Sequence, residues 1–177
     1  MPRELPIVFH KSHTRRYRST LRRADGVVVE LEGGSWNQIG PPAREVPHDL
    51  AHLVVEDELR LAHGVWGVLA DGGLFRGASI AAGRQPPHAA KRARETMLAA
   101  SEELNQAEVL TRAVCDLAID RRADLGALRA ATGPRWWSST ATEAAVRRAF
   151  ERLQELGAAW SALAPGGTLD AAWPLRG

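Results

Sequence analysis

The first third of the chain alternates apolar and polar residues in short runs of the kind typical of β-strands. Residues 5–9 form a mainly apolar run, and residues 15–23 and 27–32 form two further runs. The last two runs meet across Asp25 and Gly26, a dipeptide that commonly forms the turn of a β-hairpin. The pattern therefore predicts a β-rich N-terminal part that contains a hairpin.

A helical pattern begins near Pro47, after a segment at 35–44 whose glycine and adjacent prolines predict a loop. Pro47 suits the first turn of a helix, and residues 48–61 contain neither glycine nor proline. Residues 65–75 are apolar and contain several glycines, and we expect a helix there rather than a second hairpin. Residues 77–87 are predicted to form a connection that ends at two prolines.

The residue pattern of the second half of the chain predicts helices. Thr140 and Glu143 have the spacing of a capping box ahead of the last of them. The expected helices cover 89–105, 107–119 (as a continuation or as a separate helix), 124–131 and 144–163. Strands followed by helices indicate an α+β fold, with an N-terminal β-hairpin or small antiparallel sheet packed on a mainly helical body. We expect a single domain over residues 1–177, β-rich over 1–45 and helical over 46–177.

Composition narrows the class of protein. The 177 residues are 45% hydrophobic and 25% charged, which is typical of a globular domain and argues against a disordered or fibrous chain. The single cysteine, Cys115, lies in an apolar segment, so we expect a buried, unreactive thiol and a cytoplasmic location. No apolar run reaches the length of about 18 residues that predicts a membrane span, and the N-terminal apolar stretch is too short for a secretory signal.

Charge is nearly balanced, with 23 basic and 21 acidic residues, but it is unevenly distributed. The segment Lys11–Arg23 holds six lysines and arginines and no acidic residue, as a phosphate-binding surface would. The favoured alternative is a solvated hairpin face on which Glu30 and Glu32 pair with these cations across the strands. Nucleic acid is therefore not the expected partner, although a non-enzymatic binding protein that uses this basic hairpin remains an alternative.

The most informative segment runs from His48 to Glu56. Positions four apart lie about 40° apart around a helix, so His48, His52 and Glu56 form one line, and Asp49 falls on the same side. Two histidines at this spacing can bind one metal ion. Apolar residues on the opposite side of the helix indicate that it is interior, where charged groups need partners. The same four residues could instead form a structural polar cluster, a solvated face, or a metal-independent acid and base.

The segment also resembles known proteins. His48-Asp49-x-x-His52-x-x-Val55-Glu56, within residues 46–75, resembles a segment of uncharacterised bacterial proteins of similar size, a resemblance that implies no activity. The His-Asp-x-x-His motif is similar to the zinc motif of a class of ubiquinone-biosynthesis proteins, which have a glutamate where this chain has Gly64. It also resembles the His-Glu-x-x-His motif of zincin metalloproteases, with Asp49 in place of the glutamate.

The sequence leaves the identity of the third metal ligand undetermined. Glu56 fits best, but three ligands on consecutive turns span about 12 Å, so we expect two of the three and a residue from another segment to bind the ion. The candidates from elsewhere are Glu58, His63, His10 and His13.

The sequence thus predicts a small metal-dependent enzyme, hydrolytic or otherwise water-activating, that acts on a small-molecule or peptide substrate. The predicted metal ligands are His48, His52 and Glu56, and the ion is expected to be zinc. Asp49 and Glu56 are the predicted catalytic groups. Homo-oligomerisation is left open.

Overall fold

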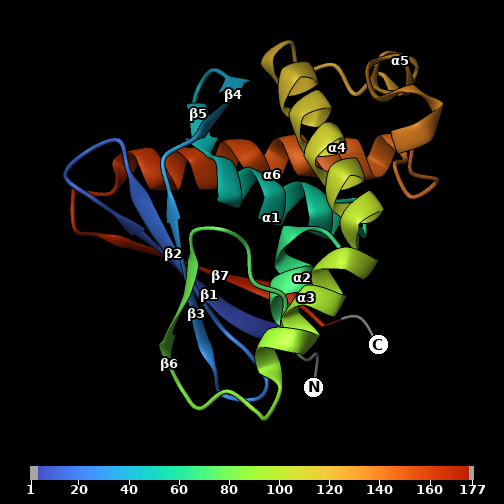
Figure 1. The fold of residues 1–177 in the computed structure, drawn as a ribbon. Helices are drawn as coiled ribbons and strands as arrows, with labels where there is room; N and C mark the ends of the chain where they lie inside the picture. The colour runs from blue at the N-terminus through green and yellow to red at the C-terminus, as the bar shows by residue number, and fades with distance from the viewer. Residues whose placement is uncertain (1–3, 176–177) are drawn as a thin grey trace.

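A computed structural model describes residues 4–175 and confirms the α+β class. Five antiparallel strands form one sheet, and a separate two-stranded sheet lies beside the helices (Figure 1). The large sheet has the order β6-β3-β2-β1-β7. Its strands are β1 (Glu4–Lys11), β2 (Tyr17–Arg22), β3 (Val28–Gly33), β6 (Ala78–Ala82) and β7 (Thr168–Pro174). The small sheet pairs β4 (Trp36–Gly40) with β5 (Arg44–Pro47).

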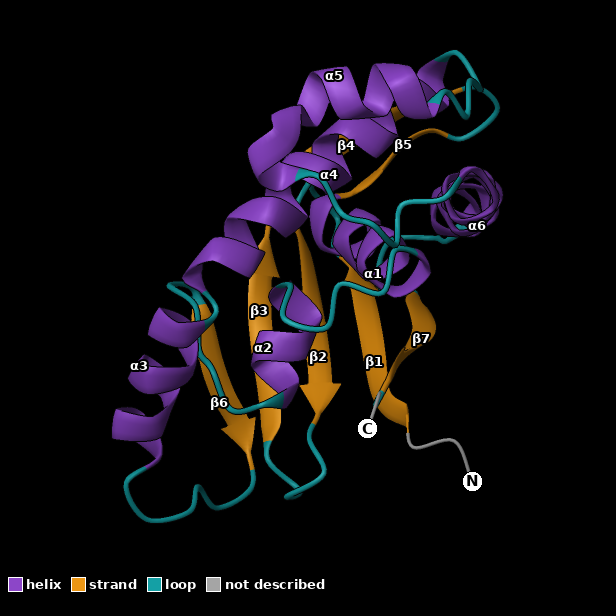
Figure 2. Cartoon of the chain, turned by 90° about the vertical axis from the view of Figure 1, so that its right-hand side faces the viewer, coloured by secondary structure: helices purple, strands orange, loops and turns teal. Residues whose placement is uncertain are grey.

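The helices gather on one face of the large sheet (Figure 2). They are α1 (His48–Glu58), α2 (Val65–Ala70), α3 (Ala89–Ala99), α4 (Ser101–Ile119), α5 (Leu125–Trp136) and α6 (Glu143–Ala162). Alternate residues of β1 and β2 face these helices, and the inward positions include Ile7, Phe9 and Leu21, all fully buried. Within residues 4–175, no helix combines the length and apolarity that crossing a membrane requires.

The predicted hairpin is present. β2 and β3 pair in antiparallel register, with Ser19 opposite Leu31, and Asp25 and Gly26 lie in the turn between them. Gly26 has φ +83°, a conformation that glycine adopts without steric cost. The Asp25 carboxylate accepts a hydrogen bond from the Val27 backbone N–H, which holds the turn together.

Two segments predicted as irregular form strands instead. The prediction of a loop over 35–44 is wrong, because most of this segment forms the hairpin of β4 and β5. The connection expected over 77–87 contains β6, which pairs with β3 at the edge of the large sheet. Both are short, and β6 is largely exposed, so neither carries a strong apolar alternation. The strands are therefore held by backbone pairing that a residue pattern does not reveal.

In the second half of the chain, the helix ends and one helix cap also differ from the predicted ones. The helix expected over 89–105 ends at Ala99, and α4 begins immediately beyond Ala100. The N-cap of α6 is Thr142, whose hydroxyl accepts a hydrogen bond from Ala145, rather than Thr140. The chain then returns to the sheet as β7, so the strands are not confined to residues 1–45.

The basic segment Lys11–Arg23 is largely engaged within the fold. As expected, Arg18 pairs with Glu30 and Arg16 with Glu32 across β2 and β3. Lys11 donates to three backbone carbonyls at the end of α6, a favourable position for a cation because helix carbonyls carry partial negative charge there. Arg23 is buried and donates to the carbonyls of Leu69 and Gly73.

Glu58, near the end of α1, links that helix to α6 through Arg148 and Arg152. Its carboxylate oxygens lie 2.8 Å from Arg148 Nε and 2.7 Å from Arg152 Nη1, and the Glu58 side chain is only 12% exposed. Although burial opposes ionisation, these two arginines hold the pKa of Glu58 below its ordinary value of 4.5.

We therefore predict that Glu58→Gln lowers the free energy of unfolding at pH 7 by about 1–3 kcal/mol, because charge-assisted hydrogen bonds are lost. The difference from wild type should shrink as pH falls below 4.5, where wild-type Glu58 becomes protonated and loses the same contribution. Urea unfolding at a series of pH values measures both effects. Glu143→Gln, which removes an exposed i,i+4 pair with Arg147, is the matched control and should cost under about 0.5 kcal/mol. A deficit for Glu58→Gln that stays constant down to pH 3 would contradict the prediction.

Candidate functional site

The central helix α1 carries the predicted site. It contacts α4, α6 and β5, and every residue from Leu50 to Glu56 is buried. A helix enclosed on all sides has no solvent to satisfy its polar side chains, so each of them requires a partner in the protein. His52 and Glu56, at the middle of this buried stretch, are 1% and 0% exposed.

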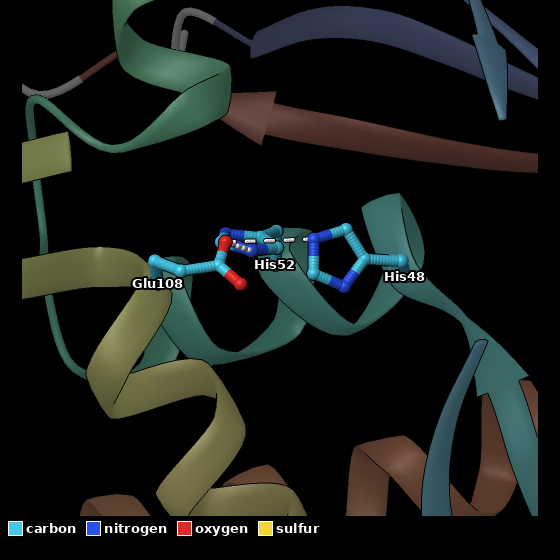
Figure 3. Close-up of side chains that lie close together, drawn as sticks. All are labelled: His48, His52 and Glu108. Atoms are coloured by element: carbon cyan, nitrogen blue, oxygen red, sulfur yellow. Dashed lines mark hydrogen bonds and ion pairs between the residues drawn. The ribbon is translucent and has the colours of Figure 1, made fainter. Parts of the chain in front are cut away.

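His52 lies between two carboxylates. Its Nδ1 is 2.9 Å from Glu56 Oε1, and its Nε2 is 3.0 Å from Glu108 Oε2, which reaches it from α4 (Figure 3). Burial alone would lower the pKa of His52, but the hydrogen bonds to Glu108 and Glu56 outweigh it and raise the pKa to about 9. Hydrogen bonds from His48 and His52 in turn hold the pKa of Glu108 well below its ordinary value.

Glu56 anchors the far side of His52. Its Oε1 accepts the Val65 backbone N–H at 2.7 Å, and its Oε2 accepts the Trp66 N–H at 3.1 Å. Both N–H groups lie at the start of α2, where helix N–H groups have no partner within the helix and favour negative charge. A Cβ atom at Gly64 would come within 2.3 Å of the Glu56 carboxyl carbon, so only glycine leaves room for this carboxylate.

His48 lies at the start of α1, one turn before His52. Its Nδ1 is 2.8 Å from Asn37 Oδ1 on β4, and its Nε2 is 3.5 Å from Glu108 Oε2. The two imidazole rings meet edge to face, with centroids 4.6 Å apart. Unlike His52, the side chains of His48 and Glu108 are partly exposed, at 29% and 58%.

Three potential metal ligands therefore converge between α1 and α4. One ligand atom each from His48, His52 and Glu108 lies within 4.8 Å of the other two, and we call this set the α1–α4 cluster. Zinc bonds of 2.0–2.1 Å in a tetrahedral site place ligand atoms about 3.3 Å apart. The distances of 3.0 and 3.5 Å from Glu108 Oε2 to the two histidine nitrogens bracket that value.

Asp49, a predicted catalytic residue, lies in a different environment. Its carboxylate accepts a hydrogen bond from Ser19 on β2, and the Tyr17 hydroxyl accepts the Asp49 backbone N–H. Its backbone carbonyl accepts the indole N–H of Trp66. Burial raises the pKa of Asp49, opposed by the nearby His48 and His52. Asp49 thus joins α1 to the sheet and to α2.

The structure also places the other candidate ligands. Glu56 lies beside His52, but its two oxygens already accept backbone N–H groups. Glu58 forms ion pairs with α6. Among residues 4–175, three potential ligands cluster in the α1–α4 cluster, which includes neither of these carboxylates nor His10, His13 or His63.

Glu108 was not among the residues that the sequence singled out. It lies 56 residues beyond His52, in a helix with several exposed glutamates. The available signals were indirect. The expected ligand spacing required a group from another segment, and Glu108 adjoins the buried positions Ala107, Leu110 and Thr111 on α4.

No protein-family model, curated protein or solved structure matches the chain. The resemblances noted for residues 46–75 therefore stay predictions. What the site can do follows from its own residues and distances.

The same substitution at the two carboxylates that flank His52 should change stability by different amounts. We predict that Glu56→Gln lowers the free energy of unfolding by about 1–3 kcal/mol, because an amide NH₂ then faces one of the two buried backbone N–H groups. Glu108→Gln should change it by less than about 1 kcal/mol, because this side chain is largely solvated. Chemical denaturation of metal-free protein measures both values. Equal losses in the two variants would show that Glu56 is not the buried anchor described above.

Proposed function

We propose that the protein is a small metal-dependent enzyme whose ion, most simply zinc, is bound by His48, His52 and Glu108. The observation that carries this proposal is the convergence of two imidazole nitrogens and one carboxylate oxygen within 4.8 Å. Two histidines and a glutamate are an established ligand set of catalytic zinc sites. In this assignment Glu108 takes the place predicted for Glu56.

The outer contacts of the two histidines support the assignment. Metal-binding histidines generally donate their second ring N–H to a carboxylate or carbonyl, which orients the ring and leaves the first nitrogen free for the ion. His52 has Glu56 at Nδ1, and His48 has the Asn37 side-chain carbonyl at Nδ1. Both rings consequently direct Nε2 toward Glu108.

The exposure of the cluster suits catalysis better than a purely structural role. His52 is buried, whereas His48 and Glu108 are partly exposed, so an ion bound here would be accessible from one side. Three protein ligands leave a position for water, and zinc lowers the pKa of bound water to about 7. A hydrolytic or other water-activating reaction on a small-molecule or peptide substrate is the chemistry we propose. The single, buried cysteine agrees with a cytoplasmic location.

A second candidate function follows from the hydrogen-bonded chain Glu56–His52–Glu108. This chain runs from a fully buried carboxylate to a half-exposed one through a single imidazole. Such an arrangement orients a histidine for general acid–base chemistry without a metal. Metal content separates the two candidates, because only the first requires an ion.

The metal proposal predicts that purified protein binds about one equivalent of zinc and that Glu108→Ala lowers zinc affinity by at least about 100-fold. The Glu108 carboxylate supplies one of three ligands, and its side chain is 58% exposed, so water can take its place beside His52 and the variant should stay folded. Isothermal titration calorimetry and elemental analysis measure binding. Glu103→Ala, which removes an exposed glutamate from the same helix, is the matched control and should bind zinc as wild type does.

Two results would count against the proposal. Wild-type protein that binds none of zinc, cobalt, manganese or ferrous iron would rule out the metal site and leave the acid–base candidate. Zinc binding that Glu108→Ala leaves unchanged would place the ion elsewhere. A panel of esters, phosphodiesters and peptides tests the reaction class, since turnover should require the ion and disappear in Glu108→Ala.

A further inference from the structure

The side chain of Asn37 connects the small sheet to the α1–α4 cluster. It lies on β4, opposite Val46 of β5, and β5 runs directly into His48 at the start of α1. The 2.8 Å contact between Asn37 Oδ1 and His48 Nδ1 spans the junction between the hairpin and the helix. The residue pattern does not reveal this contact, because it predicts a loop over residues 35–44.

The Asn37 amide has a second polar neighbour. The thiol of Cys115 on α4, which is buried, lies near the side chain of Asn37. An amide NH₂ group can donate to sulfur, and doing so leaves the amide oxygen to face His48 as an acceptor. Cys115 follows Glu108 by seven residues, which is about two helical turns. Cys115, near Asn37, and the Glu108 carboxylate of the cluster therefore lie on the same face of α4.

An acceptor at Nδ1 determines which nitrogen of His48 is available. A neutral imidazole carries one N–H, and when Nδ1 donates it to an oxygen, Nε2 keeps a free lone pair. Nε2 is the atom of His48 that lies 3.5 Å from Glu108. In the metal-free protein the Glu108 carboxylate beside Nε2 favours the opposite tautomer, so the Asn37 oxygen at Nδ1 is the contact that favours the form that an ion requires.

We propose that Asn37 is a positioning residue of the metal centre. It accepts the Nδ1–H of His48, fixes the tautomer and the ring orientation, and so directs Nε2 at the ion. This inference rests on the proposed function, because it gives the β4–β5 hairpin a role in metal affinity. The Glu56 carboxylate positions His52 in the same manner, so each of the two histidines has an oxygen acceptor at its Nδ1.

Two substitutions at position 37 distinguish the role of the Asn37 side chain as a hydrogen-bond acceptor from its role in filling space beside His48. Asn37→Leu keeps the approximate volume and removes the acceptor, whereas Asn37→Asp keeps an oxygen in its place. Gln38→Leu is the matched control, because Gln38 is the next residue of the same strand and is exposed. If Asn37→Leu disturbs the hairpin, the smaller Asn37→Ala removes the same acceptor.

The first readout is the His48 tautomer in metal-free protein that carries Glu108→Ala, where the Glu108 carboxylate no longer competes at Nε2, measured by long-range ¹H–¹⁵N correlation NMR. In this background, protein with Asn37 and protein with Gln38→Leu should show the Nδ1–H form, and Asn37→Leu should lose that preference. The second readout is affinity for Co²⁺, followed through its visible absorption. Asn37→Leu should weaken Co²⁺ binding by about 10–100-fold, and Asn37→Asp should stay within a few-fold of wild type.

The outcomes distinguish this inference from the proposed function. Wild-type protein that binds no Co²⁺ refutes the metal centre itself, and with it the role of Asn37. Wild type that binds Co²⁺ while Asn37→Leu keeps the same tautomer and affinity overturns the inference alone. Equal losses in Asn37→Leu and Asn37→Asp would also overturn it, because they would show that shape rather than the acceptor matters.

Discussion

The structure around the site depends on one buried carboxylate. Glu56 is fully enclosed, and an ionised group in that position is tolerated only when hydrogen bonds replace water. Two backbone N–H groups at the start of α2 and the ring of His52 supply them. This requirement explains why the chain turns at Gly64 as it does, since a side chain there would displace the carboxylate. The stretch from α1 into α2 is thus organised around Glu56.

That anchor makes the two histidines unequal. His52 is held within the core by Glu56, whereas His48 sits at the helix start, where it meets Asn37 and solvent. Glu108 completes the cluster from α4 and is more than half exposed. The polar groups on the buried side of the site are therefore already hydrogen-bonded, whereas the open side consists of groups that solvent or an ion can reach.

Local signals predicted the parts of this arrangement that arise within a few residues. The β2–β3 hairpin follows from its Asp25-Gly26 turn, and the common face of His48 and His52 follows from helical spacing. Glu108 and Asn37 could not be found in this way, because their roles depend on how α4 and the β4–β5 hairpin pack against α1. The same spacing that aligned Glu56 with the histidines gave no sign that α2 would occupy its oxygens.

Electrostatics gives the α1–α4 cluster a preference for positive charge. Two carboxylates flank His52, one on each nitrogen, at 2.9 and 3.0 Å. Their hydrogen bonds to His52 raise its pKa to about 9 in spite of burial, so this position favours a cation. A divalent ion between His52 and Glu108 would satisfy the same preference, with Glu56 balancing the charge from behind the imidazole. The carboxylates that hydrogen-bond His52 in the metal-free protein are therefore the groups that would favour a metal ion beside it.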